Sequence, residues 1–154
     1  MEKQLHDQHY KALAMMGVLS FICMYTLMYS MVNTFKNVFM SVNQFYMAGL
    51  MTMPMIVIEV VLMKRMYMNK TFNLAIIGFS TMALILFYVF IRQQTGVSDK
   101  QFLKSMIPHH AGAILMCENA DIHDPEIKKL CEEIIAGQQK EIEKMKSKLK
   151  ELEE

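Results

Sequence analysis

Three long apolar runs constrain most strongly what this chain can fold into. They cover about residues 12–32, 45–63 and 72–91, and each is close to the roughly 20 residues that a helix needs to cross a bilayer. Between Ala12 and Ile91 the charged residues are few: Lys36, Glu59, Lys64, Arg65 and Lys70. Buried helices of a soluble protein explain such runs poorly. We therefore predict an all-α chain whose residues 12–91 form a membrane domain of three spanning helices.

The basic residues predict the orientation of these spans. Three crossings put the polar leader, residues 1–11, on the same side as the connection between the second and third spans. That side carries Lys3, Lys11, Lys64, Arg65 and Lys70, whereas the connection at residues 33–44 carries only Lys36. The excess of Lys and Arg in cytoplasmic segments places the leader in the cytoplasm. We expect a multi-pass protein of a bacterial inner (plasma) membrane, with its C-terminal part periplasmic or extracellular.

Other features of the membrane part and leader remain open to two interpretations. Glu59 lies in the second span, where it is either functional or reaches toward Lys64 or Arg65. The 18 methionines are either flexible apolar filler or, in part, a relay of thioethers for Cu(I). His6 and His9 stand three residues apart and are either solvated or a second metal pair.

After a linker at residues 92–98, two amphipathic helices are predicted for the extracytoplasmic part, residues 99–154. Ser98 or Asp99 can cap the first. Asp124 and Pro125 are typical of the start of the second, which should run to about Leu152. The short connection between them predicts an antiparallel hairpin. The formal net charge of +1 gives no reason to expect a nucleic-acid partner.

The register of this hairpin can be predicted by setting Cys117 opposite Cys131. It puts Gly112 against Ala136, Ala111 against Gly137 and His110 against Gln138, so that small residues meet and the helices approach closely. The two cysteines then either form a disulfide or remain thiolate ligands of a metal.

Soft metal donors are concentrated in the stretch FLKSMIPHHAGAILMC, residues 102–117. Met106 and His110 are four residues apart and Cys117 follows seven later, so one helix face carries a thioether, an imidazole and a thiol. His109 and Met116 form a parallel row. These donors suit Cu(I) or Ag(I) better than hard cations. The alternative is that Met and Cys belong to the helix core and the histidines to a polar rim.

The phrases MIPHHAGAILMC, DPEIKKLCEEII and GQQKEIEKM resemble the family called domain of unknown function 305, in its membrane-anchored form with three N-terminal spans. That ferritin-like helical family includes periplasmic copper- and silver-binding proteins, and the resemblance covers roughly Asp99 to Leu149. It implies metal contacts at Met106, His109, His110, Met116 and Met145, with Cys117 and Cys131 as further thiols or a staple. Because a ferritin-like bundle has four helices, we expect two hairpins to pair in a homodimer. The alternative is that the hairpin packs against its own membrane helices.

The sequence therefore predicts a non-enzymatic, membrane-anchored protein that binds Cu(I), or Ag(I), for metal tolerance or handover to a partner protein. It contains no Ser/His/acid elbow, phosphate loop or H-E-x-x-H motif. Two alternatives remain. One is a thiol redox or sensor module that uses Cys117 and Cys131, and the other is a structural membrane protein whose hairpin serves oligomerisation.

Overall fold

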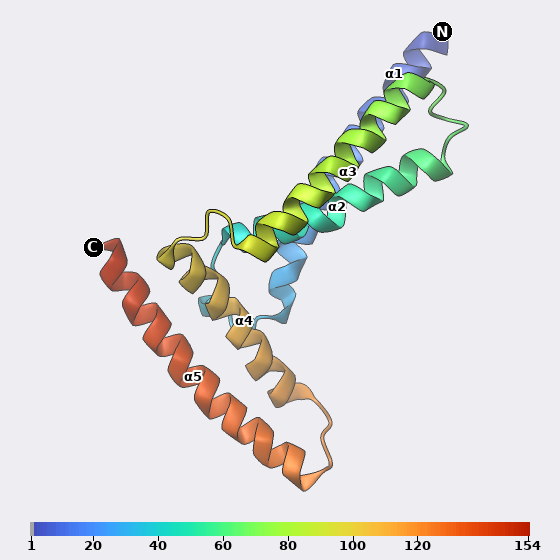
Figure 1. The fold of residues 1–154 in the computed structure, drawn as a ribbon. Helices are drawn as coiled ribbons and strands as arrows, with labels where there is room; N and C mark the ends of the chain where they lie inside the picture. Colours follow the sequence, from blue (N-terminus) through green and yellow to red (C-terminus); the bar gives the residue numbers. More distant parts are fainter. Residues whose placement is uncertain (1) are drawn as a thin grey trace. The chain divides into compact units, whose positions relative to one another are not determined.

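The computed structural model describes residues 2–154, with side chains from Gln8 onward; His6 and the rest of the leader's first seven side chains lie outside the described part. This part is all-helical, as predicted (Figure 1). Its elements are α1 (Glu2–Leu27), the 3-10 turns η1 (Met28–Met31) and η2 (Phe35–Asn37), α2 (Val42–Leu62), α3 (Lys70–Gln93), α4 (Asp99–Asn119) and α5 (Pro125–Glu153). They form two compact units. One comprises α1 with residues 45–95, and the other comprises residues 28–44 with residues 96–154.

Three helical stretches, which lie mainly in the first unit, are long and apolar enough to cross a membrane. They run over Gln8–Met31, Val42–Leu62 and Lys70–Gln93, within about one helical turn of the predicted ranges. Few residues of these stretches are buried, and many large apolar side chains face outward: Leu74 is 72% and Phe79 is 65% exposed. In water this would be costly, whereas in a bilayer it is the expected arrangement. The chain is a membrane protein by this criterion.

At the end of the unit where α2 leads into α3, aromatic rings and a small polar network hold the helices together. The ring of Tyr10 on α1 lies 5.3 Å from that of Tyr67 and 4.7 Å from that of Phe72. Its hydroxyl donates a 2.7 Å hydrogen bond to Asn73 Oδ1. The Tyr67 hydroxyl approaches Glu59 Oε1 at 3.4 Å. Glu59 is thus turned toward a tyrosine, and no described ion pair joins it to the nearby basic residues.

Close approach of α2 and α3 depends on Gly49. The residue is buried, and a Cβ atom at this position would collide with the ring of Phe87 on α3. Near the same end, the Tyr46 hydroxyl donates a 2.9 Å hydrogen bond to the carbonyl of Thr95. A glycine therefore permits the aromatic packing that joins these two spans.

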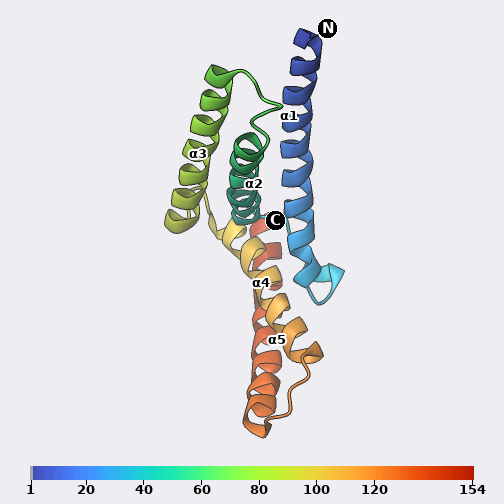
Figure 2. The same ribbon diagram turned by 90° about the vertical axis from the view of Figure 1, so that its right-hand side faces the viewer.

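In the second unit, α4 and α5 pack along each other and run in opposite directions (Figure 2). Asp124 caps α5 as expected, because its Oδ1 accepts hydrogen bonds from the backbone N–H groups of Glu126 and Ile127 at 2.8 and 3.1 Å. Pro108 lies inside α4 without ending it. The core consists of Ile107, Ala111, Ile114, Ile142 and Leu149, each at most 3% exposed.

The segment that connects the first two spans belongs to this second unit. Val32 and Phe39 pack against the α4–α5 core. Polar contacts also attach the segment to α4: the Val42 N–H donates to Gln101 Oε1 at 2.9 Å, and Asn43 Nδ2 donates to Ser105 Oγ at 3.2 Å. The core of the unit is therefore assembled from two parts of the chain that are distant in sequence.

The predicted meeting of small residues between α4 and α5 is wrong in detail. Ala111 is fully buried, but Ala136 and Gly137 on α5 are exposed. A Cβ added to Gly112 would lie 3.4 Å from the carbonyl oxygen of Met31. Gly112 thus lies beside the η1 turn rather than against α5, and large aliphatic side chains fill the helix interface.

Candidate functional site

The seven predicted ligands are distributed over both helices of the second unit. On α4 are Met106, His109, His110, Met116 and Cys117, and on α5 are Cys131 and Met145. Two of these residues, His109 and Met116, are exposed, and the other five are at least partly buried. These residues therefore do not form a single solvent-facing cluster.

Cys117 and Cys131 form a disulfide between the end of α4 and the start of α5, with their Cα atoms 5.3 Å apart. The sequence left open whether these cysteines form a disulfide or bind metal as thiolates, and the structure has the disulfide. A disulfide sulfur is not a thiolate, so neither cysteine is a metal ligand in this state. Cys23 is the free cysteine of the described chain.

His110 is the predicted ligand with the most unusual surroundings. Its side chain is 14% exposed, and its Nδ1 lies 3.1 Å from Glu141 Oε2 on α5. This contact lacks the direction of a hydrogen bond, and Nδ1 has no other hydrogen-bond partner among the described residues. The same nitrogen is shielded from solvent. Such a buried ring nitrogen without a partner requires an explanation.

The pKa of His110 is lowered from its ordinary value of 6.5, chiefly because burial penalises the charged ring. The carboxylate of Glu141 opposes this shift, and neighbouring His109 adds to it. At neutral pH the ring is therefore uncharged, which is the form of imidazole that binds metals.

The remaining candidates differ in how they could reach an ion near His110. The ring centroids of His109 and His110 are 6.1 Å apart. Met106 is half-buried one turn before His110, and Met145 packs against the core formed with Ile142 and Leu149. Met116, 55% exposed, lies further toward the disulfide end of α4. Among residues 8–154, no three His, Cys, Asp or Glu side chains are grouped closely enough to hold a metal ion by themselves.

Glu141 was not among the residues predicted for the site from the sequence. The predicted register set His110 opposite Gln138, and the carboxylate that approaches the ring lies three residues further along α5. Examining the residues of α5 within one helical turn of Gln138, the predicted neighbour of His110, would have drawn attention to Glu141. At the open end of the helix pair, Lys104 and Glu153 form a 3.0 Å ion pair with the same antiparallel sense.

Residues 91–149 match the model of the family described as domain of unknown function 305 (DUF305). The chain belongs to this family. The DUF305 region covers α4 and nearly all of α5, and hence every predicted ligand. The family's name assigns it no activity.

The chain is also similar over most of its length to the uncharacterized protein L153 of Acanthamoeba polyphaga mimivirus. The two are 39% identical over 140 residues, which cover 89% of this chain and 90% of the viral protein. The similarity therefore includes the three apolar helices as well as the DUF305 region. The viral relative gives no support to the predicted bacterial membrane. No solved structure matches the chain.

Proposed function

We propose that this DUF305 protein is a non-enzymatic membrane protein that binds a soft metal ion, Cu(I) or Ag(I), at the His109–His110 region of α4. The observation that carries the proposal is the largely buried, uncharged ring of His110, whose Nδ1 lies 3.1 Å from the carboxylate of Glu141. Its role would be metal tolerance or handover to another protein.

The donor set fits such an ion when the disulfide is intact. With Cys117 and Cys131 paired, imidazole and thioether groups remain, and both match a soft, polarisable cation. His110 and His109 would supply nitrogen, and Met106 is the thioether nearest in the helix. Met145 and Met116 are further candidates, the first after rotation out of the core.

Glu141 gives the site a second feature that metal-binding histidines commonly have. A ligating His usually directs its other ring nitrogen to a carboxylate, which fixes the orientation of the ring. The 3.1 Å approach of Glu141 Oε2 to Nδ1 would leave Nε2 of His110 as the ligand atom. Glu141 would then be a positioning residue, and a hard carboxylate oxygen would not itself need to bind the soft ion.

The membrane arrangement that suits this role puts α4 and α5 on the non-cytosolic side. Disulfides persist in oxidising compartments and are rare in the cytosol, and the Lys and Arg distribution favours the same orientation. We also propose that two α4–α5 pairs associate into a ferritin-like four-helix bundle, because a core of five buried residues is small for an independent domain.

The test is an anaerobic Cu(I) titration of the full chain in detergent against a competing chelator. The variant His109→Ala/His110→Ala should lose the tight site, while His123→Ala, in the exposed α4–α5 connection, should bind as wild type does. Glu141→Gln should weaken binding by about tenfold or more, as carboxylates that orient ligating histidines do. Its matched control is the neighbouring exposed Glu143→Gln. Absence of tight binding in the wild type, or equal binding by the double variant, would refute the metal role.

A second candidate, a thiol redox module, is favoured by the disulfide itself. Such a module requires Cys117–Cys131 to exchange with a glutathione pool, whereas structural disulfides typically have potentials below about −300 mV. Equilibration of the full chain with glutathione buffers, followed by alkylation of free thiols, measures this potential. A value near that of glutathione would favour the redox module, and a much lower value would exclude it.

A further inference from the structure

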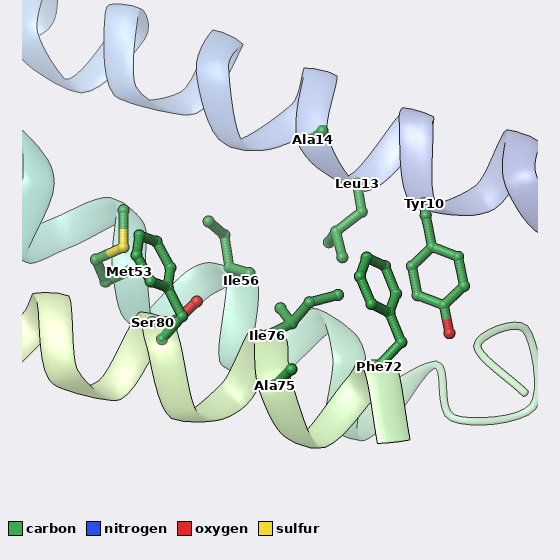
Figure 3. A pocket seen from close by; sticks show the side chains of 10 residues that line it. Tyr10, Leu13, Ala14, Met53, Ile56, Phe72, Ala75, Ile76 and Ser80 are labelled. Atoms are coloured by element: carbon green, nitrogen blue, oxygen red, sulfur yellow. The ribbon is translucent and has the colours of Figure 1, made fainter. Parts of the chain in front are cut away.

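We propose that the first unit binds one anionic phospholipid, with an acyl chain in the pocket between α1, α2 and α3 and the headgroup at the basic end of these helices. The pocket has a volume of about 410 Å³, within the usual range for ligand sites. Figure 3 shows its lining, which includes Tyr10, Leu13, Ile56, Phe72, Ala75 and Ile76. The proposal is independent of metal binding.

The chemistry of the lining selects an apolar occupant. Apart from Tyr10 and Ser80, every residue that lines the pocket is apolar. Because the Tyr10 hydroxyl already donates a hydrogen bond to Asn73 Oδ1 at 2.7 Å, it does not need a hydrogen-bond acceptor on the ligand. A polar ligand would lose its hydration without compensation here, whereas a hydrocarbon chain would not.

The depth of the pocket matches one leaflet. On α3 the lining extends from Phe72 to Ser80, which is about 12 Å at 1.5 Å per residue. Half of the hydrocarbon core is about 15 Å. Because Phe72 is in the first turn of α3, the pocket begins at a membrane interface and ends near the midplane. That is the space occupied by a single acyl chain.

Charge at the shallow end identifies the headgroup. Lys11 follows Tyr10 directly, Lys70 begins α3 two residues before Phe72, and Lys64 and Arg65 lie in the connection between α2 and α3. All four side chains are exposed. None forms an ion pair with a carboxylate of residues 8–154. Exposed cations at the membrane surface attract anionic lipids, and Lys11 and Lys70 lie within two residues of Tyr10 and Phe72 in the pocket lining.

The experiment reconstitutes the full chain in phosphatidylcholine vesicles that contain a minor fraction of phosphatidylglycerol. The protein is then extracted in mild detergent, and the lipids it retains are counted by native mass spectrometry. Wild-type protein should retain phosphatidylglycerol in preference to phosphatidylcholine. Ala75→Phe, which fills the pocket from α3, should reduce retention by about tenfold or more. Ala14→Phe fills it from α1 and provides a second variant should the first fail to fold by circular dichroism.

Two matched controls separate the pocket from general membrane effects. Ala12→Phe adds the same ring to an exposed position of α1 that does not line the pocket, and it should retain lipid as wild type does. Lys11→Gln/Lys70→Gln should keep a bound lipid but lose the preference for phosphatidylglycerol, whereas Arg92→Gln, at the other end of α3, should keep the preference.

Two results would overturn the proposal. One is equal lipid retention by wild type and by folded Ala75→Phe and Ala14→Phe. The other is loss of dimers in the pocket variants with no change in retained lipid, which would assign the pocket to a contact between two copies of the chain.

Discussion

Replacement of both disulfide cysteines should loosen the α4–α5 pair without abolishing metal binding. In the variant Cys117→Ser/Cys131→Ser, the chain between the two positions, which are 14 residues apart, is no longer closed in the unfolded state. The loop-closure entropy predicts a loss of about 3 kcal/mol for a loop of this size. That is a large fraction of the stability of a small domain, so the effect should be easy to detect.

The measurement is hydrogen exchange of the backbone amides of α4 and α5, made on the full chain in detergent. Exchange reports the local opening of these helices separately from the membrane helices. A loss of about 3 kcal/mol corresponds to exchange that is faster by about a hundredfold or more in the most protected amides. Amides around Ile107, Ile114 and Ile142, in the core, should change most.

Cys23→Ser is the matched control, because Cys23 is an exposed free cysteine in the first unit. It should leave the exchange of α4 and α5 unchanged. Thiol alkylation of denatured but unreduced wild-type protein should modify Cys23 and spare the other two cysteines. In the same preparations, the Cu(I) affinity of the disulfide variant should stay close to that of wild type, because the proposed donors are His and Met.

Unchanged protection in the double variant would refute the reasoning that the disulfide constrains this helix pair. Loss of Cu(I) binding by Cys117→Ser/Cys131→Ser, with helix content retained, would refute a purely structural role for the two cysteines. It would make them candidate metal ligands again.

Three further predictions follow from packing and burial. Ile142→Ala, at a residue 1% exposed, should lower the free energy of unfolding of the α4–α5 pair by about 2–5 kcal/mol. Ile127→Ala, at a residue 49% exposed, should change it little. A denaturant titration in which hydrogen exchange of α4 and α5 is monitored compares the two variants. Gly49→Ala should lower the thermal midpoint of the first unit in detergent, because the new Cβ collides with the Phe87 ring, and an unchanged midpoint would argue against this helix contact. With metal removed by a chelator, the pair should lose stability as pH falls below the ordinary His pKa of 6.5, because the lowered pKa of His110 makes the unfolded state bind more protons; His110→Gln should remove this component.

The apolar runs made the membrane part of the fold predictable from sequence. Helix length and apolar composition depend on local sequence alone, so the three ranges agreed with the structure to within about a turn. The start of α5 was predictable for a similar reason, since Asp124 and Pro125 act within the first turn. The local sequence pattern does not show which other part of the chain packs against each helix face. The attachment of Val32 and Phe39 to the α4–α5 core joins parts of the chain that no periodicity relates.

The candidate site was predictable in its residue types but not in its surroundings. Donor chemistry drew attention to His109 and His110. The helix register was obtained by setting Cys117 opposite Cys131, and it left open whether these two cysteines form a disulfide or bind metal. The carboxylate at His110 was missed because Glu141 belongs to a run of alternating charges, where one Glu resembles another. The small residues Ala136 and Gly137 were misassigned because a small side chain is compatible both with a close helix contact and with an exposed surface.

The disulfide links the two candidate functions and makes them distinguishable. When Cys117 and Cys131 are paired, α4 and α5 are held together and the site is left with imidazole and thioether donors. Reduction would release two thiols near the connection between the helices, and thiolates bind Cu(I) more strongly than thioethers do. Metal affinity that is independent of the disulfide therefore indicates a His and Met site built for an oxidising compartment, whereas affinity that rises on reduction indicates a protein in which redox state controls metal capture.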